Sequence, residues 1–75
     1  MKVGDLVRLR DDIQLPVEVY SSWNFAILTD EIGDIYHYQT AIVLDFCRRR
    51  NRIPGVKVAV ENLIGWTYES FLVPV

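Results

Sequence analysis

The sequence has little of what most chemical sites require. Its 75 residues include one cysteine, Cys47, and one histidine, His37. A zinc site needs three or four converging ligands, so these two residues cannot form one. One cysteine also excludes a disulfide framework and favours a reducing, intracellular setting, in which Cys47 is a small core residue. We therefore expect no metal ion and no cofactor, and we interpret His37 as a half-exposed strand histidine.

Phosphate-binding and catalytic motifs are missing as well. The four glycines stand singly, so no glycine-rich loop can cradle a phosphate. No serine is marked as an activated nucleophile, because no base with an orienting group can be assigned to it. Asp30, Glu31 and Asp34 offer oxygen ligands for a hard cation, but their spacing fits no EF-hand and favours a solvated turn. The sequence predicts a protein that is not an enzyme and has no catalytic residues.

Long apolar runs and targeting signals are also absent. No stretch approaches the roughly 18 consecutive apolar residues of a membrane-spanning helix. Lys2 is not followed by the apolar segment of a secretion signal, and the last five residues, FLVPV, lack the cysteine of a lipidation motif. We expect no membrane association and no secretion signal.

The composition is that of one small folded domain. Apolar residues make up 51% of the chain and charged residues 24%, which excludes disorder. We assign residues 1–75 to a single domain, which at this size buries only about 60% of the surface of its unfolded chain, so that a partner or a homo-oligomer would add stability. Eight basic and ten acidic residues give a net charge of −2, which argues against a dedicated nucleic-acid binder.

Three segments alternate in the manner of half-buried strands: residues 3–10, 40–47 and 56–60. Within 40–47, alternation assigns Ile42 and Leu44 to one face, and Val43 and Asp45 to the other. An arginine-rich stretch at 48–52 precedes Pro54-Gly55, which predicts a β-hairpin with a basic tip. Glu61-Asn62 predicts the next turn, and residues 65–68 a short strand.

Residues 11–39 are harder to assign. Asp11, Asp12 and Pro16 indicate that the chain leaves the sheet after the first strand. Three pieces are short, apolar and aromatic enough to be strands: 17–20, 24–28 and 34–38. We predict a long loop that contains irregular strands.

The segments GDLV, IVLDF followed by VKVAV, and GWTYESFLVPV form a pattern that resembles SH3-like barrels. In that family a short strand, one helical turn and a last strand close the barrel. The resemblance covers residues 1–10 and 40–75. It implies an all-β fold: a small SH3-like barrel of about five short strands, with a long first loop and a short helical turn near the C-terminus.

The chain is also similar to the small barrel proteins of tailed bacteriophages, most of which have no assigned activity. This similarity implies a phage-encoded protein that resides in the host cytoplasm or in the virion.

Aromatic residues are concentrated in the middle segment, where Tyr20, Trp23, Phe25, Tyr36 and Tyr38 lie. The aromatics outside it, Phe46, Trp66, Tyr68 and Phe71, are predicted to be core. Those of the middle segment exceed what a narrow barrel can enclose, and tryptophan and tyrosine commonly anchor protein interfaces. Either they form an exposed patch, or the loop folds over an open barrel end and covers it.

Half of the basic residues lie at one hairpin tip: Arg48, Arg49, Arg50 and Arg52. Guanidinium groups bind phosphates and carboxylates well, so the tip is a candidate for contact with a partner. The alternative is a solvated hairpin end that keeps a sheet edge from aggregating.

The function predicted from these features is a non-enzymatic protein-interaction module, either a virion component or a small host-directed factor. The predicted protein-binding residues are Tyr20, Trp23, Tyr36, Tyr38, Arg48, Arg49, Arg50 and Arg52. The partner is another protein of the virion or the host. A nucleic-acid-binding barrel that sets the arginine tip against phosphates is the alternative.

Overall fold

A computed structural model describes residues 1–23, 30–50 and 53–75, and in these ranges the chain forms seven strands and one 3-10 turn. The elements are β1 (Leu6–Leu9), β2 (Val17–Tyr20), β3 (Glu31–Ile35), β4 (Ala41–Cys47), β5 (Gly55–Val60), β6 (Leu63–Tyr68), η1 (Glu69–Phe71) and β7 (Leu72–Pro74). The all-β class and the C-terminal helical turn are confirmed, whereas the expected number of about five strands is wrong. Over the same ranges, no helix has the length and apolar character needed to cross a membrane.

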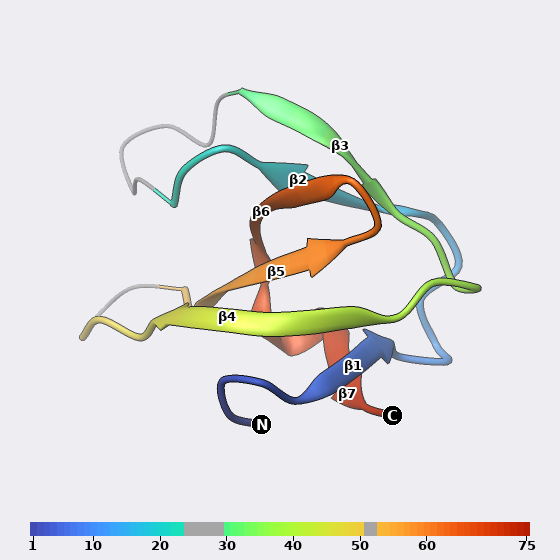
Figure 1. Cartoon of the computed structure of the whole chain (residues 1–75), viewed down its shortest axis with the longest axis horizontal. Helices are drawn as coiled ribbons and strands as arrows, with labels where there is room; N and C mark the ends of the chain where they lie inside the picture. Colours follow the sequence, from blue (N-terminus) through green and yellow to red (C-terminus); the bar gives the residue numbers. More distant parts are fainter. Residues whose placement is uncertain (24–29, 51–52) are drawn as a thin grey trace.

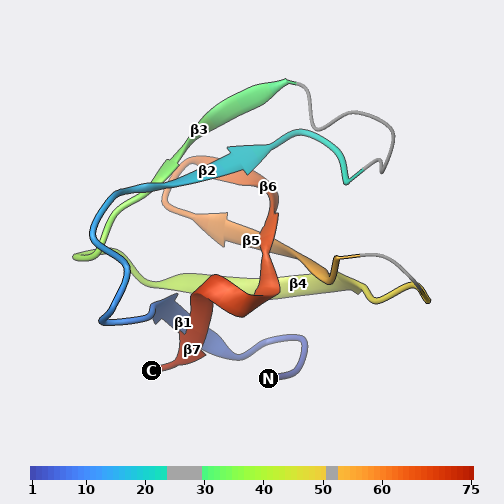
Figure 2. The same cartoon turned by 180° about the vertical axis from the view of Figure 1, so that it is seen from behind.

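The strands form one antiparallel sheet in the order β3-β2-β6-β5-β4-β1-β7, and this sheet is strongly curled (Figures 1 and 2). The last strand pairs with the first as expected, with Leu9 opposite Leu72 and Val7 opposite Pro74. The edge strands β3 and β7 do not pair with each other, so the sheet is an open half-barrel and not the sealed barrel predicted. β7 is only three residues long, and Pro74 has no N–H to donate to a further strand.

The predicted long loop contains a regular hairpin. β2 pairs with β3, with Val17 opposite Ile35 and Val19 opposite Gly33. The strand predicted at 34–38 ends at Ile35, because a turn follows in which the Gln39 N–H donates to the Tyr36 carbonyl at 3.0 Å. His37 therefore lies exposed in a turn and not in a strand. The strand predicted at 24–28 lies outside the described residues.

The core lies on the concave face of the curled sheet and is built largely of valines, which suit a pleated surface. Its buried members are Val7, Leu9, Val17, Val19, Ile35, Ala41, Val43, Val56, Val58, Val60 and Leu72. The predicted alternation of β5 is confirmed by Val56, Val58 and Val60. Thr67 is the buried polar side chain of the described residues, and its hydroxyl donates to the Glu18 carbonyl at 3.0 Å.

A β-bulge in β4 overturns part of the predicted alternation. Val43 lies opposite Val58, but Asp45 lies opposite Lys57, so Leu44 is an extra residue in the ladder. An extra residue reverses the phase of every side chain that follows it. Asp45 and Cys47 consequently share the outer face with Ile42, and Phe46 packs against the core. The prediction that Cys47 is a core residue is wrong.

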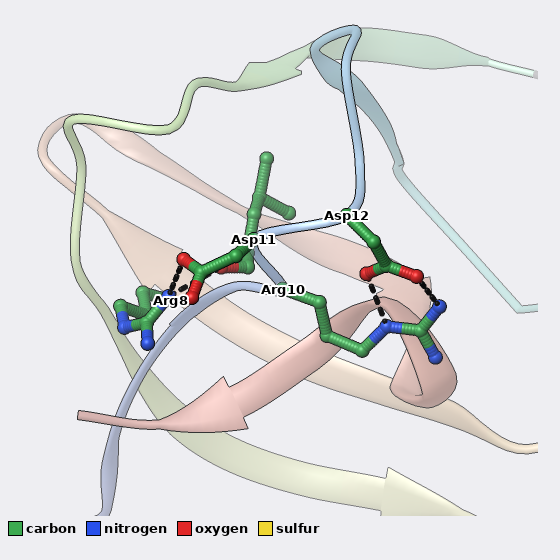
Figure 3. Close-up of polar contacts among 5 residues, drawn as sticks. Arg8, Arg10, Asp11 and Asp12 are labelled. Carbon is green, nitrogen blue, oxygen red and sulfur yellow. Dashed lines mark hydrogen bonds and ion pairs between the residues drawn. The ribbon is translucent and has the colours of Figure 1, made fainter.

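Two arginine–aspartate pairs hold the corner after β1, where Asp11 and Asp12 were expected to end the strand (Figure 3). Arg8 Nη1 lies 2.7 Å from Asp11 Oδ1, and Arg10 Nη2 lies 2.8 Å from Asp12 Oδ2. The hydrogen bond from Arg10 lowers the pKa of Asp12. Arg10 Nη1 also donates to the Ser70 carbonyl in η1 at 2.8 Å. Both arginines are thus neutralised within the chain.

Candidate functional site

The convex side of β4, β5 and β6, here called the outer face, carries the candidate site. Cross-strand register aligns its side chains in rows: Ile42, Ala59 and Ile64; Asp45, Lys57 and Trp66; Cys47, Gly55 and Tyr68. The alternate residues of these strands, such as Val58 and Thr67, face the core. The third row lies at the end of the sheet where β2 and β4 end and β5 begins (Figure 1).

Trp23 lies flat on Gly55 in this third row. A Cβ placed on Gly55 would fall 2.4 Å from Cε2 and from Nε1 of the indole, so only glycine leaves room for the ring. The indole N–H donates to the Ile53 carbonyl at 3.0 Å, and the ring meets Tyr68 edge-on with centroids 4.9 Å apart. Trp23 therefore ties the chain after β2 to the start of β5.

Beside Trp23 the outer face is hollowed into a groove of about 410 Å³, here called the loop-end groove. Its lining residues are Ser21, Ser22, Trp23, Asp45, Phe46, Cys47, Arg48, Arg49 and Trp66. It combines two indole rings, two hydroxyls and two guanidinium groups. Such a groove can hold an apolar or planar group against the indoles while Arg49 holds an anionic group.

The arginines of the hairpin tip differ in their surroundings. Arg48 Nε lies 2.7 Å from Glu69 Oε1, and its guanidinium lies 3.9 Å from the centre of the Phe46 ring. The hydrogen bond to Glu69 raises the pKa of Arg48. Arg49 and Arg50 are exposed and form no ion pair within the described ranges. Arg52 lies outside those ranges. Among the described residues of the tip, the charge that is free for a partner is thus carried by Arg49 and Arg50.

Tyr36 and Tyr38 do not join this groove. They lie in the turn between β3 and β4, at the end of the molecule opposite the β4–β5 hairpin tip (Figures 1 and 2). Their rings stack with centroids 5.6 Å apart, and Tyr38 is 80% exposed. The predicted binding residues are therefore divided between two ends of the molecule.

Tyr20 is buried and its hydroxyl is already engaged. It donates a hydrogen bond to Glu18 Oε2, and this bond together with burial raises the pKa of Tyr20 to about 12. A shallower cleft of about 260 Å³ lies beside it. The cleft is lined by Ile13, Leu15, Pro16, Val17, Glu18, Tyr20, Tyr68 and Phe71. Tyr20 is placed to support the sheet more than to project toward a partner.

Trp66 is the site residue that the sequence reasoning missed. It was expected in the core with Phe46 and Phe71, which do pack there, but it lies half-buried in the loop-end groove. The alternation of this strand contained the signal. Trp66 lies between Gly65 and Thr67, so it shares a face with Ile64 and not with the buried Thr67. Asp45 carried no such signal, because the bulge at Leu44 brings it to the groove.

Across the described ranges, no three His, Cys, Asp or Glu side chains lie close enough to hold a metal ion. His37 is in the distant β3–β4 turn, and Cys47 is half-buried in the lining of the groove. Comparison of the chain with family models, curated proteins and solved structures gives no match.

Proposed function

We propose that this chain is a non-enzymatic protein-interaction module that binds its partner in the loop-end groove. The observation that carries the proposal is the convergence of Trp23, Trp66 and Arg49 on one hollow of the outer face. Tryptophan and arginine are the residue types most enriched at the energetic centres of protein interfaces. The partner segment that fits this groove has an apolar or aromatic side chain flanked by carboxylates.

The finer fold assignment within this proposal is an SH3-like half-barrel. Three features support it: β1 pairs with both β4 and β7, η1 lies between β6 and β7, and a hairpin fills the connection between β1 and β4. The resemblance to small phage barrels supports a phage-encoded protein, with a virion or host protein as its partner in the virion or the host cytoplasm.

The test is capture of partners by the tagged protein from infected or expressing cells, followed by mass spectrometry and by titration of the captured protein. Wild type and the Tyr38→Ala control, which is altered at the opposite end, bind equally. Trp66→Ala and Arg49→Ala each weaken binding by about tenfold or more, in keeping with interface centres. A partner that binds all four proteins with one affinity contradicts the proposal.

Single-stranded nucleic acid is the second candidate, favoured by one observation: two indoles and two arginines line the same groove. Bases stack on indole rings and arginines hold phosphates, which is how many single-strand binders work. A salt titration separates the candidates. Binding to an oligonucleotide falls steeply with salt, by a slope of about −0.7 per phosphate contact, whereas a protein contact with apolar anchors weakens much less.

A further inference from the structure

An apolar row crosses four adjacent strands of the outer face. Leu6 of β1 lies opposite Ile42 of β4. Ile42 lies opposite Ala59 of β5, and Ala59 lies opposite Ile64 of β6. Residues paired in this way on one face are about 5 Å apart, so these four side chains, here called the outer apolar row, form a continuous strip. Leu6, Ile42 and Ile64 are 51%, 44% and 57% exposed.

A pair of opposite charges borders this row. Asp45 and Lys57 lie opposite each other in the next row of the outer face, where the bulge at Leu44 places Asp45. Neither takes part in an ion pair of the described ranges. Asp45 Oδ1 instead accepts a hydrogen bond from the Phe46 N–H at 2.8 Å. Both charges are therefore free to interact with a second molecule.

We propose that the outer apolar row is the contact between two copies of this chain in a twofold dimer. With the axis parallel to the strands and between β4 and β5, Ile42 meets Ala59 of the second copy. The same operation sets Asp45 against Lys57, while Leu6 and Ile64, which lie farther from the axis on the convex face, border the contact. A large side chain thus meets a small one, and each acid meets a base. A surface that matches itself after a twofold rotation is the requirement for an isologous dimer.

The size of the row sets the strength of the contact. A contact built on four side chains from each copy buries less surface than the roughly 1,200–2,000 Å² of a stable interface. The dimer is therefore weak, and its population depends on the protein concentration. Apolar side chains in a continuous exposed strip favour association over solvation. The contact uses none of Trp23, Trp66 and Arg49, but its Asp45 also lines the loop-end groove, so the two proposals share one side chain and are tested with different variants.

The first test is sedimentation equilibrium of the full chain between about 10 µM and about 1 mM, the range for a contact of this size. Wild type shifts toward twice the monomer mass as its concentration rises. Ile42→Lys lowers the association constant about tenfold or more, because it sets an unpaired charge into an apolar contact. The control Leu15→Lys changes a side chain that is 75% exposed but lies outside the row, and it associates as wild type does. A wild type that is monomeric throughout overturns the proposal.

The second test separates contacts between copies from contacts within one chain. Asp45→Lys alone sets like charges against each other across the dimer axis, and so does Lys57→Glu alone, so each variant is monomeric at concentrations where wild type dimerises. An equimolar mixture restores opposite charges at both positions and produces the heterodimer. Circular dichroism of each variant verifies the fold. A mixture that stays monomeric where wild type dimerises overturns the proposed register.

Discussion

Gly55 determines the position of Trp23, and through it one wall of the loop-end groove. The indole occupies the space that a side chain at residue 55 would fill, and its N–H is engaged by the Ile53 carbonyl. Trp23 therefore has a structural role in the free protein as well as the proposed role in binding. A side chain that is held in place before a partner arrives loses less conformational freedom on binding.

Gly55→Ala is expected to displace Trp23 and to lower the free energy of unfolding by about 1–3 kcal/mol, the usual cost of overpacking. Denaturant unfolding measures this loss, and tryptophan fluorescence reports the displaced ring. In a Trp23→Ala background the same change costs less than about 0.5 kcal/mol, because alanine is otherwise no worse than glycine in a strand. Equal losses in the two backgrounds would show that the indole is not the obstacle.

The ionisation of Tyr20 is expected to lower the stability of the folded protein at alkaline pH. Its hydrogen bond to Glu18 raises the pKa of Tyr20 to about 12 in the folded state, from an ordinary value of 10.0. The folded state thus holds the phenolic proton more tightly than the unfolded state. This contribution is fully present below pH 10 and is lost as the pH rises toward 12.

Glu18→Gln is expected to lower the pKa of Tyr20 and to make the loss of stability between pH 10 and pH 12 shallower than in wild type. Urea unfolding at several pH values measures the slope, and absorbance at the phenolate band follows the ionisation. Tyr38→Phe, which removes an exposed phenol, leaves the contribution of Tyr20 intact. Parallel pH profiles for wild type and Glu18→Gln would rule out this origin of the effect.

At the scale of elements, regular alternation was enough to predict some strands and failed where an extra residue interrupts it. The valines of β5 follow from the residue pattern alone, whereas the η1 turn was implied by the resemblance to SH3-like barrels. The bulge at Leu44 could not be predicted from the pattern, because a regular strand that buries Ile42, Leu44 and Phe46 is equally apolar. The groove could be predicted only in part. Trp23 and the arginine tip were identified from the sequence, whereas the positions of Asp45 and Trp66 depend on how the strands pair.

The β2–β3 hairpin is joined to the rest of the sheet along a narrow seam. β2 pairs with β6 at Tyr20 and Trp66 alone, whereas β5 pairs with β6 along its whole length. Gly65 lies at the seam, where a Cβ would fall 2.6 Å from the Tyr20 carbonyl oxygen and 2.7 Å from Val19 Cγ1. Backbone on one side and a core side chain on the other leave little space for adjustment.

Gly65→Ala is expected to separate the β2–β3 hairpin from β6 while the β4–β5 pairing persists. Amide hydrogen exchange should then show lost protection in β2 and β3 and retained protection in β4 and β5. Gly33→Ala is the matched control, because the three atoms nearest to its Cβ would all belong to the Leu63 side chain, the first at 3.0 Å, and this side chain can move. Uniform loss of protection across all strands would mean that the seam is no weaker than the rest of the sheet.

For the whole molecule, the question is whether the edge strand β3 belongs to the same cooperative unit as the central strands. Ile35 on β3 is fully buried and is a member of the same core cluster as Val58 of β5 and Leu9 of β1. A single core of this kind, in a chain of 75 residues, is typical of two-state unfolding. The narrow seam concerns backbone pairing, and the shared core couples the hairpin to the sheet across it.

Ile35→Val is therefore expected to lower the free energy of unfolding of the whole domain by about 0.5–1.5 kcal/mol, the usual cost of removing one buried methyl group. In a domain of this size the midpoint of thermal unfolding falls by about 4–8 °C for each kcal/mol. Circular dichroism, which reports the sheet, and tryptophan fluorescence, which reports Trp23 and Trp66 at the loop-end groove, should record the same midpoint. Ile64→Val, at a position of β6 that is 57% exposed, stays within about 0.5 kcal/mol of wild type. Two separate midpoints in Ile35→Val would show that the edge hairpin unfolds on its own and that the core does not couple it to the remaining strands.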